Sequence, residues 1–184
     1  MKSGRLQFKA ERFKTSYDFK RYPDLPDSFE NNWKNNSRDW LILLDGNTEL
    51  RRWKCQTVAN YCFGAMATAD TIPCGDTVAP GEFTVECFVP PRGFHGEIHA
   101  ITRTRDIDGQ WIDHHAMQTT AGGFQNGRWL IHDRFSVKLG KDSDYAWSAG
   151  CFILASQDLA ALNQAARSLG VIPGDLIPGM LLEL

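Results

Sequence analysis

Alternating apolar and polar positions across residues 40–154 predict β-strands. In residues 82–88, Phe83, Val85 and Cys87 alternate with Glu82, Thr84 and Glu86, which is the period-2 pattern of a half-buried strand. Residues 41–44 form an apolar run before Asp45-Gly46, a strong turn signal, so residues 50–58 are expected to return antiparallel. Further strands are expected at 97–104, 110–118, 128–131 and 180–184. The chain is therefore predicted to be mainly β, with a mostly antiparallel sheet that is curled or forms a sandwich.

One helix is well indicated near the C-terminus. Ser156 is the expected N-cap, and Asp158 lies in the first turn, where the helix dipole favours an acid. Apolar residues then recur on one face before Gly170, namely Leu159, Leu162, Ala166 and Leu169. We expect this helix to pack on the sheet.

Residues 1–38 differ in composition from the rest of the chain. They are rich in Lys, Arg, Asp and Asn, carry isolated aromatic residues, and contain a Pro23-Asp24-Leu25-Pro26 break. This composition is compatible with a mobile tail or a partner-binding segment. The aromatic side chains favour instead an arm that docks on a domain formed by residues 39–184.

Length and charge limit the classes of function. A chain of 184 residues is long enough for one good core. Its 20 basic and 22 acidic side chains are nearly balanced and form no basic stripe, so nucleic acid is not an expected partner. No apolar run approaches the roughly 18 residues of a membrane span. Residues 1–5 lead into charged sequence rather than a signal-peptide core, so the chain as written is expected to start in the cytoplasm.

Candidate chemistry is concentrated in residues 128–154. An apolar run ends at His132, a polar loop follows, and the chain re-enters apolar sequence at Cys151, which is preceded by Ser148-Ala149-Gly150. A thiolate is the nucleophile in cysteine catalysis, and a histidine within hydrogen-bond reach can take the thiol proton. Gly150 would allow backbone N–H groups to turn toward a substrate carbonyl and form an oxyanion hole. The alternative is a buried free cysteine beside an unrelated histidine.

This segment resembles the catalytic motif of the L,D-transpeptidase (YkuD-like) domain. In that family a histidine precedes a Ser/Thr-His-Gly-Cys element by slightly under twenty residues, and the spacing from His132 to Cys151 is 19 residues. Residues 76–85 are similar to the family's Thr-Pro-x-Gly turn and strand, and residues 40–47 to its opening hairpin. Together the three blocks cover residues 40–154 in the family's order.

Two positions depart from the family pattern. Ala149 stands where the family has a second histidine, and the arginine or asparagine common after the cysteine is absent from Phe152-Ile153-Leu154. Peptidoglycan-degrading relatives, including secreted antibacterial effectors and phage-borne forms, also show Ser-x-Gly-Cys without that histidine.

The resemblance implies a cysteine acyl-transfer enzyme that acts on peptidoglycan stem peptides without a cofactor. Cys151 would attack the carbonyl of the L-centre preceding the terminal D-alanine, His132 would shuttle protons, and the N–H groups of Gly150 and Cys151 would hold the oxyanion. The product would be that of an L,D-carboxypeptidase, an L,D-transpeptidase or both, and the smaller Ala149 favours hydrolysis over cross-linking.

The resemblance also implies action in the periplasm or cell wall. This would require a specialised export route, delivery by lysis, or a signal that has been removed. The alternatives are an antibacterial effector or lysin of the same fold that damages peptidoglycan, and an inactive wall-binding module, in which Cys151 would show ordinary thiol reactivity.

Four further residues are candidates for a supporting role: Ser148, Asp133, Trp147 and Tyr145. Asp133 follows His132 directly and would point away from it in an extended backbone. A backbone carbonyl or Asp113 is therefore expected to hold the imidazole. Tyr145 and Trp147 would line the substrate groove or belong to the core.

Two other clusters provide alternative readings. His95, His99, His114 and His115 suggest a metal site, since His95, Glu97 and His99 would share one face of a strand. However, His95-Gly-Glu-Ile-His99 is not the His-Glu-x-x-His zinc motif, so surface imidazoles are the favoured reading and no metal is expected. Besides Cys151, the chain has Cys55, Cys62, Cys74 and Cys87, which would form two disulfides in any of three connectivities or remain reduced.

Overall fold

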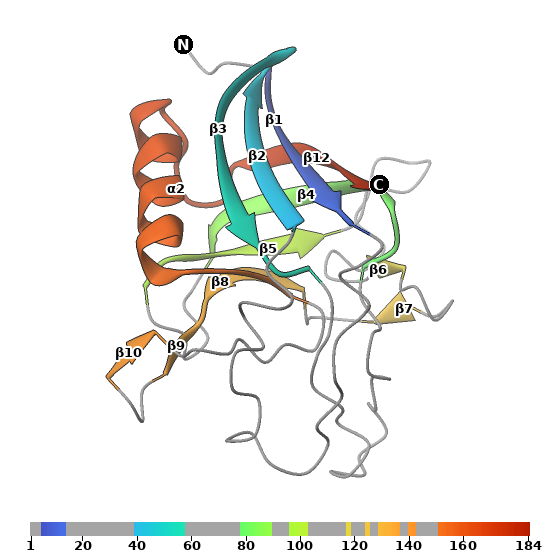
Figure 1. Ribbon diagram of the computed structural model, residues 1–184. Helices are drawn as coiled ribbons and strands as arrows, with labels where there is room; N and C mark the ends of the chain where they lie inside the picture. The colour runs from blue at the N-terminus through green and yellow to red at the C-terminus, as the bar shows by residue number, and fades with distance from the viewer. Residues whose placement is uncertain are drawn as a thin grey trace, which may run out of the picture.

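The computed structural model describes nine segments of the chain (Figure 1), namely residues 5–13, 39–57, 78–89, 96–102, 117–118, 124–125, 129–136, 140–142 and 151–184. Eight strands form one sheet in the order β11-β8-β5-β4-β12-β1-β2-β3. Their bounds, in chain order, are β1 Leu6–Arg12, β2 Asp39–Asp45, β3 Thr48–Cys55, β4 Gly81–Val89, β5 Ile98–Thr102, β8 Leu130–Asp133, β11 Phe152–Leu154 and β12 Leu176–Glu183. Two short pairs lie outside this sheet, β6 Met117–Gln118 with β7 Phe124–Gln125 and β9 Phe135–Ser136 with β10 Lys141–Asp142.

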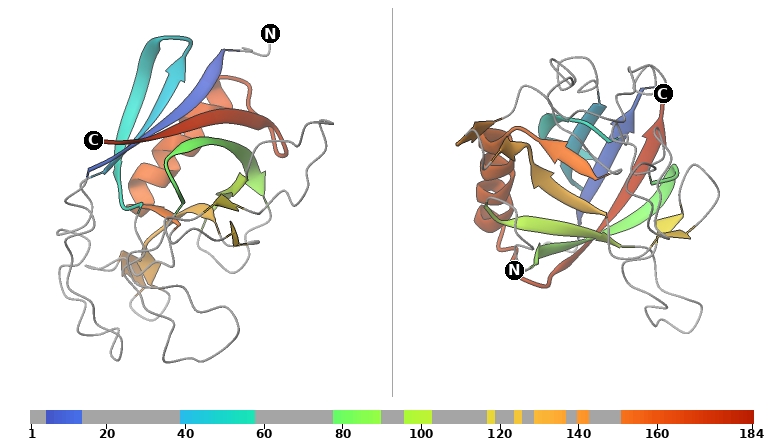
Figure 2. Two further views of the ribbon diagram at one scale, coloured as in Figure 1. Left: turned by 90° about the vertical axis from the view of Figure 1, so that its right-hand side faces the viewer. Right: turned by 90° about the horizontal axis from the view of Figure 1, so that it is seen from below.

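The sheet is curled until its two edge strands meet. Just beyond β3, Gln56 exchanges two backbone hydrogen bonds of 2.9 Å with Ile153 of β11. The sheet is therefore nearly closed, and Figure 2 shows its strands wrapping around a common interior. The prediction of a mainly β, mostly antiparallel, curled sheet is confirmed, and the parallel pairs are β1 with β12 and β8 with β11.

Strand β1 lies within the segment expected to be an arm. It pairs in parallel with β12 and antiparallel with β2, and Leu6, Phe8, Ala10 and Arg12 are buried. The seven residues of β1 thus form an internal strand of the sheet, because every second side chain along the strand is buried. Residues 14–38 lie outside the described part of the chain.

The other strands lie where the sequence pattern predicts them, except that the bounds of β8 and β12 differ from the expected ones. The hairpin of β2 and β3 turns at Gly46, whose φ of 58° suits glycine. Strand β8 runs to Asp133, so His132 lies within the strand and not at its end. Strand β12 begins at Leu176, four residues earlier than expected, and lies between β4 and β1. Of the strand expected at 110–118, only Met117–Gln118 is described.

Helix α2 spans Ser156–Ser168 and packs against the sheet through Leu159, Leu162 and Ala166, as predicted. The expected N-cap is wrong by one residue. Ala155 is the N-cap and makes no side-chain capping bond, while Ser156 is the first helical residue. Its hydroxyl binds Asp133 of β8 instead.

Buried side chains form two clusters on opposite faces of the β8–β11 region. The larger one fills the interior between the sheet and α2, and Ile131, Phe152 and Leu154 belong to it. The smaller one consists of Ile98, Ala100, Leu130, Cys151 and Ile153. Because neighbouring residues on a strand face opposite sides, the thiol of Cys151 faces away from the helix.

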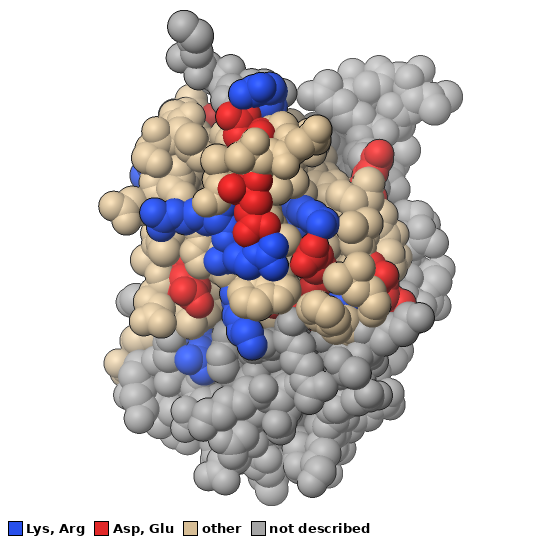
Figure 3. All heavy atoms as spheres, turned by 45° about the horizontal axis from the view of Figure 1, so that its top comes forward, with Lys and Arg blue, Asp and Glu red and all other residues tan. Residues whose placement is uncertain are grey.

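Charged side chains on the outer face of the sheet are of both signs (Figure 3). Arg5 pairs with Asp45, Lys9 with Glu11, and Arg52 with Glu49. No helix in the described segments is long and apolar enough to cross a membrane.

Candidate active site

His132 lies on β8, Cys151 directly precedes the parallel strand β11, and the two side chains face the same side of the sheet. The register places Ile153 opposite His132, and Cys151 is two residues before Ile153. Side chains two residues apart on a strand share a face, so the imidazole and the thiol share one. Adjacent strands lie about 4.8 Å apart and two residues span about 6.6 Å along a strand, so diagonal neighbours of this kind are roughly 8 Å apart at the backbone. The fold therefore brings the two predicted catalytic residues together.

The strand that begins after Cys151 is held on both edges. Its three residues pair with Ile131, His132 and Asp133 on β8, and Ile153 bonds Gln56 on the other side. Cys151 and His132 are each only 7% exposed. Both side chains are therefore held in an environment largely shielded from water, where electrostatic interactions are strong.

The orientation of the imidazole is fixed by the backbone. Nδ1 of His132 lies 2.6 Å from the carbonyl oxygen of Asp133. A carbonyl only accepts hydrogen bonds, so the ring carries its proton on Nδ1 and Nε2 is the acceptor nitrogen. The sequence left two hydrogen-bond partners open for this ring, a backbone carbonyl and Asp113. The observed partner is a backbone carbonyl, that of Asp133.

Burial is the largest influence on the basicity of this histidine. It lowers the pKa of His132 from 6.5 to about 4, against the opposing effects of the Asp133 carbonyl and the Asp133 charge. Removal from water disfavours the charged imidazolium. His132 is therefore neutral at pH 7 and able to accept a proton.

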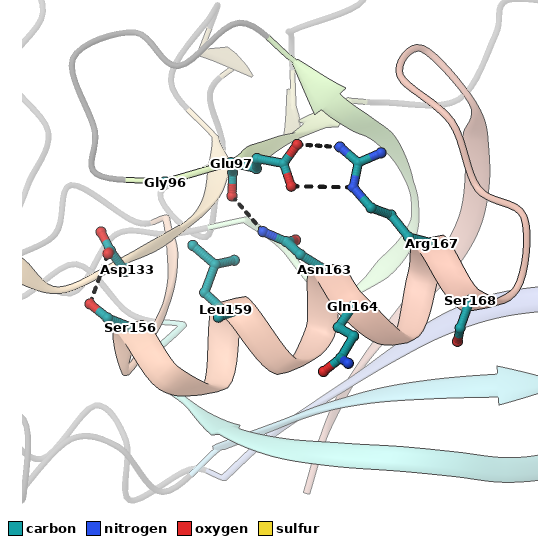
Figure 4. Close-up of a pocket in the computed structure, with 10 residues that line it drawn as sticks. Gly96, Glu97, Asp133, Ser156, Leu159, Asn163, Gln164, Arg167 and Ser168 are labelled. Carbon is teal, nitrogen blue, oxygen red and sulfur yellow. Dashed lines mark hydrogen bonds and ion pairs between the residues drawn. The ribbon is translucent and has the colours of Figure 1, made fainter.

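The carboxylate of Asp133 serves another purpose. Its Oδ2 accepts a hydrogen bond of 2.8 Å from the hydroxyl of Ser156 at the start of α2. The two groups border a cavity of about 740 Å³ that runs along the helix to Arg167 (Figure 4). From the sequence we expected Ser156 to be the N-cap of α2, so its hydrogen bond to Asp133 on β8 was not predicted.

The other candidate residues of this site lie outside the described segments. These are Gly150, Ser148, Trp147, Tyr145 and the alternative partner Asp113. The oxyanion hole formed by Gly150 and Cys151 stays a prediction, as does the role of the two aromatic residues.

Two of the four remaining cysteines are described, and both are reduced. Cys55 and Cys87 are free and buried. Burial raises the pKa of the Cys55 thiol well above its usual range and that of Cys87 to about 12. Neither forms a thiolate near neutral pH, so neither competes with Cys151 as a nucleophile. Cys62 and Cys74 lie outside the described residues.

His99 is a structural residue and not a metal ligand. It is fully buried; its Nδ1 accepts a hydrogen bond from the N–H of Phe88 at 3.2 Å, and Nε2 lies 2.7 Å from Oδ1 of Asn163 on α2. Glu97 pairs with Arg167. Among the described residues no group of three His, Cys, Asp or Glu is arranged to hold a metal, and His95, His114 and His115 lie outside them.

Fold and site together define a mainly β protein that carries a histidine and a cysteine on one face of a curled sheet. No family model matches the chain. An uncharacterized protein of Treponema pallidum (strain Nichols) is 54% identical over 174 residues, which are 94% of this chain and 78% of that protein. The chain belongs to the same family as this Treponema pallidum protein.

Proposed function

We propose that the protein is a cysteine acyl-transfer enzyme of the L,D-transpeptidase-like class that acts on peptidoglycan stem peptides in the periplasm or cell wall. The observation that carries this proposal is the position of His132 on β8 and of Cys151 just before the adjacent parallel strand β11, on one face of the sheet. The resemblance of residues 40–154 to that family supports the choice of substrate.

The proposed reaction begins with transfer of the Cys151 proton to Nε2 of His132. The sulfur attacks the carbonyl of the L-centre that precedes the terminal D-alanine, and the N–H groups of Gly150 and Cys151 stabilise the oxyanion. When this intermediate collapses, the C–N bond breaks and the imidazolium gives its proton to the leaving amine. The lowered pKa of His132, about 4, makes the imidazolium a stronger acid at this step and the neutral ring a weaker base for the thiol proton, because the charged form is costly in a buried site.

The second half of the reaction releases the acyl group from sulfur. Water gives a proton to His132 and attacks the thioester carbonyl, and the thiol regains its proton as the C–S bond breaks. The products are a shortened stem and free D-alanine. An amine from a neighbouring stem in place of water would give a 3–3 cross-link by the same proton transfers.

Incubation with a disaccharide tetrapeptide tests the proposal. We expect release of D-alanine and a mass increase of the intact protein that peptide mapping assigns to Cys151. Cys151→Ala should show neither, and His132→Asn should lose on the order of 10²-fold in rate or more.

Cys87→Ala is the matched control, because it removes a thiol that is buried and does not ionise near neutral pH. This variant should retain the adduct and the activity. Absence of any adduct in the wild-type protein, or an adduct at another cysteine, would contradict the proposed nucleophile.

A further inference from the structure

The hydrogen bond between Ser156 and Asp133 joins the two chain segments that carry the proposed catalytic residues. Ser156 follows Cys151 by five residues, and Asp133 directly follows His132. The Ser156 hydroxyl donates to Asp133 Oδ2 at 2.8 Å, as Figure 4 shows. Asp133 is 5% exposed. This partly buried bond restrains the strand that carries the proposed base relative to the segment that follows the proposed nucleophile.

Asp133 is the last residue of β8 and lies beyond the register pairs of β8 with β5. Toward β11, the N–H of Arg134 donates to the carbonyl of Leu154 at 3.1 Å. Toward β5, the register pairs are His99 with Ile131 and Ala100 with Leu130, so Asp133 lies two residues beyond them. The carbonyl that orients His132 thus lies where the β5 pairing has ended.

The start of α2 is suited to restrain a carboxylate. The first N–H groups of a helix have no partner within the helix, and its N-terminus favours negative charge. Ala155 makes no side-chain capping bond. The carboxylate of Asp133 is therefore attracted to the helix end to which Ser156 binds it.

We propose that Ser156 and Asp133 form a positioning pair that fixes the Asp133 carbonyl on Nδ1 of His132 and thereby keeps the imidazole in the tautomer that presents Nε2 as the base. Both residues would act on the reaction through the Asp133 carbonyl and not as reacting groups. The catalytic consequence rests on the proposed function, whereas the effect on the tautomer does not.

Nitrogen-15 NMR of the histidine side chains reads the tautomer directly. In the wild-type protein we expect His132 to be protonated on Nδ1. Ser156→Ala and Asp133→Ala should both produce a mixture of the two tautomers. They should also lower kcat for D-alanine release between tenfold and about 10²-fold with little change in KM, the scale of loss expected when a reacting group is misplaced.

Three variants separate positioning from general damage. Ser156→Thr keeps the hydroxyl and Asp133→Asn keeps the acceptor oxygen, so both should restore the Nδ1 tautomer. Ser168→Ala removes another α2 hydroxyl that borders the same cavity but bonds Ala165 of its own helix at 2.7 Å. It should leave the spectrum and the rate unchanged.

The inference is overturned if His132 keeps its wild-type tautomer in both Ser156→Ala and Asp133→Ala, or if Ser156→Thr is as impaired as Ser156→Ala. Should the tautomer shift as expected while the wild-type protein releases no D-alanine, the positioning pair stands and the proposed function fails.

Discussion

In the proposed reaction, the low pKa of His132 would extend activity to acidic pH. The ring must be neutral to accept the thiol proton, and it protonates only near pH 4. The acidic limb of kcat/KM, which reports the free enzyme, should therefore have its midpoint near 4, with little loss between pH 7 and 5. D-alanine release measured from pH 3.5 to 8 checks this, with samples returned to pH 7 to exclude denaturation. A midpoint between 6 and 7 would show that the imidazole is more exposed to water than in this structure.

Gly179 on β12 is required by close packing rather than by its backbone conformation. A Cβ at this position would lie 2.4 Å from Cε2 of Phe83. The Phe83 ring is buried and packs edge-on against Phe152, which follows Cys151, with centroids 5.8 Å apart. Gly179→Ala should therefore destabilise the protein by about 1–3 kcal/mol in urea denaturation, the usual range for overpacking.

Phe83→Leu provides the control for Gly179→Ala, because it makes the side chain next to position 179 smaller. The double variant with Phe83→Leu should lose less stability than the sum of the two single changes, because residues in contact are not additive. Additive losses would mean that the two side chains do not compete for the same space.

Single residues were predicted from the sequence when their chemistry stood out locally. His132 and Cys151 were found by residue type and spacing, and the structure places them on one face of the sheet. The roles of Ser156 and Asn163 were missed because their partners, Asp133 and His99, are 23 and 64 positions away. Nothing in the local sequence distinguishes such a hydroxyl or amide from a surface one.

Among the strands, alternation was informative where a strand had one buried and one exposed face. The signal for β1 was present, since Leu6, Phe8 and Ala10 alternate with Gln7, Lys9 and Glu11, but the charged composition of residues 1–38 outweighed it. Strand β11 shows no alternation because its two faces belong to different buried clusters. Its parallel pairing with β8, which creates the site, could not be predicted from three apolar residues.

The contact between α2 and β5 should make the fold sensitive to acid. His99 bonds the N–H of Phe88 and the amide of Asn163, and burial lowers the pKa of His99 to about 4. A second proton would place an N–H on Nδ1 facing the Phe88 N–H. Protonation therefore favours the unfolded chain, in which the pKa is about 6.5.

Because the pKa of His99 is lower in the folded protein than in the unfolded chain, the protein loses stability as the pH falls. The stabilisation from neutral His99 is complete above pH 6.5 and is lost as the pH falls toward 4, by up to about 3 kcal/mol. Urea denaturation at pH 7.5 and pH 5 should show this loss. His99→Gln should be less stable at pH 7.5 but should lose less on acidification, and an unchanged pH dependence in this variant would contradict the assignment.

In the whole molecule, a buried polar network lies where the sheet closes. Asp39 accepts hydrogen bonds from the N–H of Phe13 at 3.0 Å and from the hydroxyl of Thr57 at 2.6 Å. Arg12 donates to the same hydroxyl oxygen at 2.8 Å and to the carbonyl of Val78 at 2.9 Å. Arg12 and Asp39 are fully buried. The network joins β1, β2 and the chain just beyond the Gln56 bridge.

Removing the Asp39 carboxylate from this network should strongly destabilise the protein. Asp39→Ala leaves buried N–H groups without their acceptor and leaves Arg12 as a buried charge without the network's carboxylate, a type of change that costs about 3–5 kcal/mol. Thermal and urea denaturation measure the loss. Arg52→Ala is the control, because its partner Glu49 is on the surface, and it should change stability little. Equal effects of the two substitutions would mean that the network does not stabilise closure.

The closure of the sheet was beyond what the sequence could predict. The strand pattern indicated a curled sheet or a sandwich, and in the described residues the single eight-stranded sheet and the bridge between Gln56 and Ile153 favour the curled sheet. These residues are 97 positions apart, and no sequence pattern indicates that they pair. Long-range register is set by how all strands pack around one core, which a local pattern does not contain.

In the proposed reaction, the ratio of hydrolysis to transfer depends on the whole molecule, since it is set by which acceptor reaches the acyl group. In the L,D-transpeptidase pattern a histidine stands two residues before the cysteine, where this chain has Ala149. Alanine is smaller and donates no side-chain hydrogen bond, so we expect it to hold an incoming amine less firmly and to admit water more easily. Muropeptide mass spectrometry should therefore show tripeptide stems in excess of 3–3 dimers. Ala149→His should raise the proportion of dimers if this reasoning is correct. Abundant dimers or D-amino-acid exchange in the wild-type protein would show instead that the acceptor is bound without a side chain at position 149.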